Sequence, residues 1–197
     1  MTNLRVEIID DFLPDPESFR AEAVRQKFYD IRGPDGEVYK NIVVRPTNEF
    51  DALLTEKLGR KVTAGYSLLR VNFDGEMPNN AVHSDNSYDQ YAAVLYLNTP
   101  EQCRGGTAFW RHKEFGWTNW PTEQQVRQTC QKPAKVQAKL AASYNDPDAW
   151  EMVHQAEMKF NRIILYPTTV FHSRWPWAAW GKTVDDARLI WVSFFSV

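Results

Sequence analysis

Cysteine, net charge and long apolar runs are all scarce in this chain of 197 residues. The 2 cysteines, Cys103 and Cys130, stand in neither CxxC nor CxxH spacing, which predicts reduced thiols in a cytoplasmic protein. A formal net charge of -2 supplies no basic field, so nucleic acid is not an expected partner. No apolar run approaches the length of a membrane span. Residues 1–13 carry acidic side chains where a signal peptide needs positive ones, so neither membrane insertion nor export is expected.

Internal repeats, linkers and low-complexity tracts are also lacking. A chain of this length buries about two thirds of its unfolded surface as one unit, so residues 1–197 are expected to form a single domain. The hydrophobic content is 43%, and the chain has 8 Trp. This composition is typical of a globular fold with an aromatic-lined interior or pocket.

Two helices are expected near the N-terminus. Asp15 is placed to cap the first helix, with Pro16 at its first position. A second helix is expected over residues 47–58, with Thr47 as its cap and Gly59 as its stop.

From residue 61 onward, the hydrophobic pattern changes to the period of two that strands show. So many strands without strand–helix alternation predict a jelly roll or barrel, mostly β with flanking helices. Strands are expected at about residues 66–73, 81–83, 90–97, 107–110, 162–166, 170–172 and 188–195, with an earlier strand at 4–9 and a hairpin around 38–44.

A polar segment rich in Gln, Lys and Ala interrupts the strands at about residues 121–157. Thr122 and Gln125 have the spacing of a capping box, and Asp146 is expected to open a shorter helix that contains Trp150. This pattern predicts a helical insertion. Both a lid beside a pocket and a solvated outer helix pair fit this pattern.

His83 and Asp85 form the most informative pair in the sequence. They lie two positions apart in a segment predicted to be extended, so both side chains should point to the same face and can share one metal ion. His172, from a distant strand, would complete a face of two histidines and one carboxylate. That face leaves the other coordination positions open, as in non-haem Fe(II) oxygenases.

Each part of this set has an alternative. His112 and Glu114 have the same spacing as His83 and Asp85, but they stand in a charged run that is typical of a solvated turn. His172 taken alone also fits a hydrogen-bonded core histidine.

Arg188 begins a very apolar predicted strand, where an unpaired cation is costly. A guanidinium suits two-pronged binding of a carboxylate, so a dicarboxylate cosubstrate would satisfy it. A salt bridge to Asp185, Asp186 or another internal acid is the structural alternative. Arg174 is the rival anchor, although residues 175–177, Trp-Pro-Trp, suggest that it lies in a loop.

Five segments follow one another in a characteristic order: His83-Ser84-Asp85, Tyr96-Leu97-Asn98, Gly105-Gly106-Thr107, His172 and Arg188. From residue 66 onward the chain resembles the 2-oxoglutarate and Fe(II)-dependent oxygenases, especially the prolyl-4-hydroxylase-like branch. Residues 105–112 and 160–173 are similar to a bacterial group within it, the DUF6445 type. The ordered set carries the resemblance, because each segment alone is common.

The resemblance implies a double-stranded β-helix, or jelly roll, in which His83, Asp85 and His172 bind Fe(II). It implies that Arg188 holds the distal carboxylate of 2-oxoglutarate, and Tyr96 matches a tyrosine that helps to hold it in some members. The implied activity is that of a dioxygenase that uses O2 to hydroxylate an amino acid, a peptide or another small metabolite, with release of succinate and CO2. Asp85 stands where halogenating relatives have a small non-coordinating residue, which favours hydroxylation.

Two other classes of function stay open on the sequence alone. A non-catalytic metal-binding jelly roll would keep the histidines without a cosubstrate, and a cupin-like metalloenzyme would use oxygen without 2-oxoglutarate. The segment between His172 and Arg188 is longer and richer in Trp than in compact members of the resembled family, which makes it a candidate substrate wall.

Overall fold

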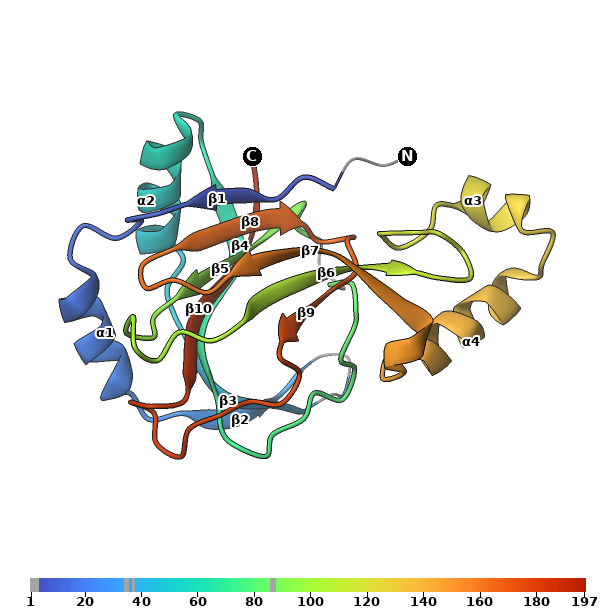
Figure 1. Ribbon diagram of the computed structural model, residues 1–197. Coiled ribbons are helices and arrows are strands. Elements are labelled where there is room, and N and C mark those ends of the chain that lie inside the picture. Colours follow the sequence, from blue (N-terminus) through green and yellow to red (C-terminus); the bar gives the residue numbers. More distant parts are fainter. Residues whose placement is uncertain (1–3, 34–35, 37, 86–87) are drawn as a thin grey trace.

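The computed structural model describes residues 4–33, 36, 38–85 and 88–197. Within these ranges the chain forms mainly antiparallel strands with a few helices (Figure 1). In chain order the elements are β1 (Glu7–Ile9), α1 (Pro16–Val24), β2 (Tyr29–Arg32), β3 (Val38–Val44), α2 (Asn48–Leu58), β4 (Thr63–Asn72), β5 (Tyr91–Tyr96), β6 (Gly106–His112), α3 (Glu123–Gln128), α4 (Pro133–Ser143), the 3-10 turn η1 (Pro147–Ala149), β7 (Trp150–Glu157), β8 (Ile163–Pro167), β9 (His172–Trp175) and β10 (Arg188–Ser196).

The strands form two sheets that face each other as in a jelly roll, which is the predicted fold class. The larger sheet has seven strands in the order β1-β8-β5-β10-β4-β3-β2, and the smaller has three in the order β7-β6-β9. Figure 1 shows α1 and α2 beside the large sheet, and α3 and α4 at the other end of the molecule. Because side chains alternate along a strand, each strand of the large sheet offers one face to the helices and the other to the small sheet.

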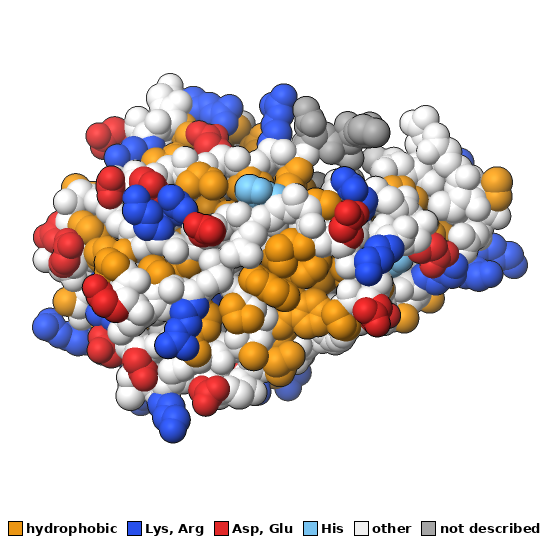
Figure 2. Space-filling view, in the orientation of Figure 1, with side chains coloured by type: hydrophobic (Ala, Val, Ile, Leu, Met, Phe, Trp, Pro, Cys, Tyr) orange, Lys and Arg blue, Asp and Glu red, His pale blue; other side chains and the backbone are white. Residues whose placement is uncertain are grey.

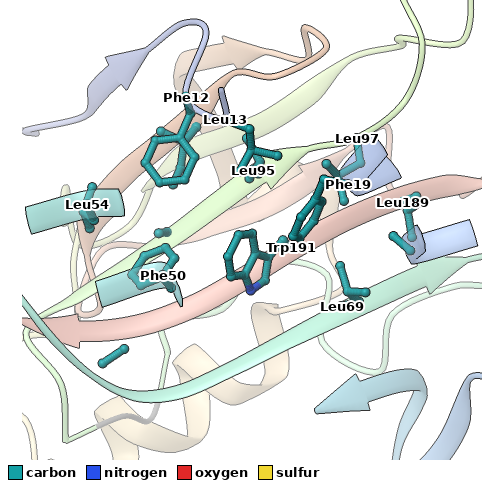
Figure 3. Close-up of a cluster of buried hydrophobic side chains, with 14 of the residues drawn as sticks. Phe12, Leu13, Phe19, Phe50, Leu54, Leu69, Leu95, Leu97, Leu189 and Trp191 are labelled. Atoms are coloured by element: carbon teal, nitrogen blue, oxygen red, sulfur yellow. The ribbon is translucent and has the colours of Figure 1, made fainter. Parts of the chain in front are cut away.

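The main core lies between the large sheet and the first two helices. Figure 3 shows Trp191 of β10 between Phe19 of α1 and Phe50 of α2. The ring of Trp191 stacks on Phe19 at 4.8 Å and meets Phe50 edge-on at 5.6 Å. Its indole nitrogen donates to Ser67 Oγ at 2.6 Å, so the one polar atom of this side chain is satisfied. The main core therefore covers one face of β4 and β10, and the opposite face is available for a functional site.

The first helix begins as predicted, and the second differs in its cap. Asp15 accepts a hydrogen bond from Ser18 N at 3.2 Å, with Pro16 at the first position of α1. Gly59 ends α2 with φ 64, which glycine adopts without strain. The prediction that Thr47 caps α2 is wrong, because its backbone is helical rather than extended and its side chain makes no capping hydrogen bond.

Two other local predictions are wrong. Asp146 caps the short helix as expected, but this helix ends after the three residues of η1. Trp150, which it was expected to contain, begins β7, which pairs with β6 from His112↔Trp150 to Gly106↔Glu157. This ladder satisfies backbone groups that a single helical turn would leave open. The strand expected at residues 81–83 is reduced to one isolated bridge between His83 and His172.

The helical insertion covers the outer face of the small sheet. Val136 and Leu140 of α4 pack with Trp110, Trp150 and Phe171. The end of the insertion also holds the segment that carries His83. Tyr144 O accepts from Val82 N at 2.9 Å, and Asn145 Oδ1 accepts from Ala81 N at 2.8 Å. The packing of α4 on the small sheet agrees with the outer helix pair, one of the two alternatives.

The surface shows no expanse of a single charge on the face that Figure 2 draws, where acidic and basic side chains are interspersed around an apolar area. None of the helices in the described part of the chain is long and apolar enough to cross a membrane.

Gly106 of the central strand β6 lies in register with Glu157 of β7 and Trp175 of β9. A Cβ at this position would lie 2.0 Å from Ala156 O, and the residue has φ 148. Gly106→Ala is therefore expected to lower the free energy of unfolding by more than about 2 kcal/mol, measured by urea denaturation.

Gly116→Ala is the matched control, because Gly116 also has positive φ (71) but a Cβ there meets nothing within 4 Å. It is expected to cost about 1 kcal/mol from backbone strain alone. Equal losses of unfolding free energy in the two variants would show that the close contact at Gly106 does not contribute to the effect of its substitution.

Candidate metal centre

His83, Asp85 and His172 each offer one ligand atom, and these atoms lie within 4.8 Å of one another. The bridge that joins the two histidines explains their proximity, because His83 N donates to His172 O at 3.0 Å and His172 N donates to His83 O at 2.8 Å. The imidazole rings consequently lie side by side with their centroids 4.5 Å apart. A backbone hydrogen bond fixes the position of Asp85, whose N–H donates to Thr168 O at 2.8 Å.

Both imidazoles are oriented by backbone carbonyls. The Nδ1 atom of His83 lies 3.2 Å from Ala81 O, and that of His172 lies 3.0 Å from Val170 O. A carbonyl oxygen can only accept, so each Nδ1 carries the proton and each Nε2 keeps a free lone pair. The two Nε2 atoms are 4.0 Å and 3.7 Å from the Asp85 carboxylate oxygens. This is the tautomer and orientation in which histidines bind metal.

The Asp85 carboxylate is a buried acceptor without a donor. Its Oδ2 atom is buried and has no hydrogen-bond partner among the described residues. A buried unpaired carboxylate oxygen is costly, and a cation at this point would satisfy it. The donor set of two imidazole nitrogens and one carboxylate oxygen therefore fits Fe(II), with the open positions that the 2-His-1-carboxylate arrangement leaves.

Burial controls the protonation of all three groups. It raises the pKa of Asp85 to about 6. Burial also lowers the pKa of His172 to about 4, and burial with the charge of the neighbouring His172 lowers the pKa of His83 to about 4. The side chain of His83 is 39% exposed, against 13% for Asp85 and 7% for His172, so the site is reached from the His83 side.

Divalent metal is expected to stabilise the protein more at pH 7.5 than at pH 5.5. The histidines are neutral at both pH values, but Asp85 holds its proton below about pH 6, so metal must displace that proton at pH 5.5. Saturating Mn(II) should raise the melting temperature by about 5 °C or more at pH 7.5, measured by differential scanning calorimetry. A larger shift at pH 5.5 than at pH 7.5 would contradict the role of Asp85.

Arg188 lies on the inner face of β10, 4% exposed, in register with Asn72 of β4. One guanidinium nitrogen donates to Asn72 Oδ1 at 3.2 Å, and its buried Nε has no partner in the described ranges. The structural alternative of an ion pair to an acid nearby in sequence does not fit. Asp185 pairs with Arg20 at 3.0 Å, and Asp186 accepts hydrogen bonds from Thr183.

Tyr96 is fully buried on the same inner face, and its hydroxyl lies 2.8 Å from Thr107 Oγ1 of β6. Burial raises the pKa of Tyr96 to about 12, so it stays a neutral phenol. Tyr96 is in register with Ile190 of β10, so Arg188, two positions away on the same face, is its diagonal neighbour. Arg188, Tyr96 and Thr107 together offer donors to an anion between the sheets.

Arg174 lies in β9 and not in the loop that the following Trp-Pro-Trp suggested. The Ser173 backbone pairs with Ala108 of β6, and the same ladder continues through Arg174↔Thr107. The Arg174 guanidinium donates to two backbone oxygens, Trp177 O at 2.7 Å and Glu76 O. Arg174 is therefore committed to holding two loops together, whereas Arg188 has donors to spare.

His112 and Glu114, the second pair with metal-ligand spacing, have separate structural roles. His112 is buried, and its ring meets Trp150 edge-on at 4.9 Å, so the expectation of a solvated turn is wrong for this residue. Glu114 forms an ion pair with Lys139 of α4. Neither side chain belongs to the group of possible metal ligands.

Sequence reasoning missed two side chains of the inner face, Arg70 and Tyr166. The ring of Tyr166 lies 4.7 Å from that of His172, and burial, followed by the charge of Asp85, raises its pKa well above the usual value. Arg70 stands in the apolar run of β4, next to Leu69 and Val71. The same signal that singled out Arg188, a cation inside an apolar strand, could have identified Arg70.

Comparison with known proteins supports the fold. A family model described as "Family of unknown function (DUF6445)" matches residues 1–178. A search of curated proteins found no match.

Solved structures with the same fold include a Pseudomonas putida prolyl-4-hydroxylase (14% identity, TM-score 0.54, 98% of this chain and 93% of that chain). AviO1 from Streptomyces viridochromogenes Tue57 is similar at 12% identity and TM-score 0.53, over 98% and 90% of the two chains. The epimerase SnoN in complex with Fe3+, alpha ketoglutarate and nogalamycin RO is similar at 16% identity and TM-score 0.52, over 98% and 78%.

Proposed function

Given that this chain belongs to the DUF6445 family, whose function is unknown, we propose that it is an Fe(II)- and 2-oxoglutarate-dependent dioxygenase. The observation that carries the proposal is the Asp85 carboxylate, whose buried Oδ2 atom has no donor among the described residues and which faces the free Nε2 atoms of His83 and His172. Iron bound there supplies the activation of O2 that drives oxidative decarboxylation of 2-oxoglutarate to succinate and CO2.

Each group of the chain then has a role. His83, Asp85 and His172 hold the iron and keep its remaining positions free. Arg188 binds the distal carboxylate of 2-oxoglutarate through its free donors, with Tyr96 and Thr107 beside it. The 4% exposure of Arg188 keeps water from this ion pair, which strengthens it.

Hydroxylation is the reaction we propose, on an amino acid, a peptide or another small metabolite. The presence of Asp85 supports it, because a carboxylate at this position occupies the place that a halide would need. The similar solved structures include both a prolyl-4-hydroxylase and an epimerase. The two free cysteines, Cys103 and Cys130, favour a cytoplasmic location.

The test is succinate formation by purified protein with Fe(II), 2-oxoglutarate and air. Succinate and CO2 are expected in equal amounts, and removal of O2 or iron should stop their formation. Iron binding without any consumption of 2-oxoglutarate would contradict the proposal and favour a non-catalytic or cupin-like metal protein.

A further inference from the structure

Arg70 lies on the same face of the large sheet as Arg188, and the proposed function gives it no role. It lies on the inner face of β4, in register with Ile42 of β3 and Ile190 of β10. Burial lowers the pKa of Arg188 to about 10, and the positive charge of Arg70 adds to this decrease. Arg188 is in register with Asn72, two positions along β4 from Arg70, so the two arginines are diagonal neighbours on one face of the sheet. Arg70 therefore lies close to the cosubstrate anchor.

The guanidinium of Arg70 lacks a partner of its own. Its Nε is buried without a hydrogen-bond partner, and no hydrogen bond or ion pair of Arg70 is found within the described ranges. The charge of Glu76, and more weakly that of Tyr39, raises the pKa of Arg70 against the stronger effect of burial. The Glu76 carboxylate, however, already accepts from Phe73 N at 3.0 Å and from Asn72 at 3.3 Å. Arg70 lies in register with two isoleucines and has unused hydrogen-bond donors. Burial of such a cation costs free energy unless an anion pairs with it.

The charges of the loaded site lead to the same conclusion. Fe(II) brings two positive charges, and Arg70, Arg174 and Arg188 bring three more. Asp85 and Glu76 each bring one negative charge, and 2-oxoglutarate brings two. One positive charge is left without compensation, and Arg70 carries the free donors.

The surroundings of Arg70 indicate what the rest of the ligand is like. Tyr66, Leu68 and Arg70 alternate on one face of β4, and Val44 of β3 lies across from Leu68. Tyr66 is 39% exposed and Val44 is 51% exposed, so this face presents apolar surface to solvent beside the guanidinium. Arg70 itself is partly exposed, whereas Arg188 is deep, so Arg70 can be reached after 2-oxoglutarate has bound.

We propose that Arg70 binds a carboxylate of the primary substrate, and that the apolar part of the substrate lies against Val44 and Tyr66. The inference rests on the proposed function, because it assigns Arg188 to the cosubstrate. It narrows the substrate class to carboxylic acids with an apolar body.

The experiment measures binding and not turnover. Protein loaded with Mn(II) is first titrated with 2-oxoglutarate, and the complex is then titrated with hexanoate or with its neutral analogue hexanamide, by isothermal titration calorimetry. Wild-type protein is expected to bind hexanoate at least about tenfold more tightly than hexanamide, the effect of one charge-assisted contact. Arg70→Gln should lose this preference, and Arg70→Lys should restore part of it. Arg111→Gln removes an exposed arginine that pairs with Glu151, and should keep the preference.

The outcomes separate the two proposals. Failure of wild-type protein to bind 2-oxoglutarate would overturn the proposed function. Binding of 2-oxoglutarate with equal affinity for hexanoate and hexanamide would overturn only the role of Arg70. Loss of 2-oxoglutarate binding in Arg70→Gln, with retention in Arg188→Gln, would make Arg70 the cosubstrate anchor and would also overturn it. Circular dichroism of each variant shows that a loss of binding is not a loss of fold.

Discussion

Asp85→Ala is expected to abolish iron-dependent formation of succinate. The substitution removes the only carboxylate between the Nε2 atoms of His83 and His172 among the described residues, and two neutral imidazoles alone hold Fe(II) weakly. Loss of a residue that merely supports a metal ligand costs about 10- to 100-fold in metal affinity, so loss of a ligand should cost more than about 100-fold. Metal content after dialysis and the rate of succinate formation are the two measurements.

Glu114→Ala is the matched control for this variant. Glu114 also follows a histidine by two positions, but it pairs with Lys139 on the surface. Its removal should leave metal content and succinate formation within about twofold of wild type, since an exposed ion pair contributes little. Equal losses in Asp85→Ala and Glu114→Ala, or full activity in Asp85→Ala, would contradict the assignment of the ligands.

Arg188→Gln is expected to raise the 2-oxoglutarate concentration for half-maximal rate by about 10- to 100-fold, the effect of one buried charge-assisted pair. Glutamine keeps an amide NH2 group that can donate hydrogen bonds but cannot supply the charge that the distal carboxylate needs. The rate at saturating 2-oxoglutarate should fall much less, because Arg188 is not one of the candidate metal ligands. Initial rates of succinate formation over a wide range of 2-oxoglutarate concentrations measure both quantities.

Arg188→Lys is the control that keeps the charge, and it should recover part of the affinity. An unchanged 2-oxoglutarate requirement in Arg188→Gln would transfer the anchor to another cation. Arg174 is the weaker candidate for that role, because its guanidinium already donates to Trp177 O and Glu76 O.

The convergence of His83, Asp85 and His172 could be predicted from the sequence because few residue types bind iron and their spacing limits the choices. The structure brings these side chains together, and their binding of iron is still a prediction. The strand basis of the prediction was only partly right. His83 forms a single bridge to His172, and what holds its segment is the end of the helical insertion, through Tyr144 and Asn145.

Contacts between distant segments explain what the sequence could not predict. Trp150 to Glu157 carry no strong local signal for a strand, and they become β7 only because the open edge of β6 offers a ladder. Arg70 lacks a polar partner across the sheet because its neighbours in register are Ile42 and Ile190, which belong to strands far apart in the chain. The contrast between Arg174 and Arg188 likewise depends on Glu76 O, 98 residues away from Arg174.

The most direct test of a single iron held by three distant side chains is a crystal structure grown without oxygen in the presence of Fe(II) and 2-oxoglutarate, with anomalous diffraction at the iron edge. One iron peak is expected at about 2.0–2.3 Å from the Nε2 atoms of His83 and His172 and from a carboxylate oxygen of Asp85. The distal carboxylate of 2-oxoglutarate is expected on Arg188. An iron peak elsewhere, or one that touches only one of the two histidines, would contradict the proposed centre.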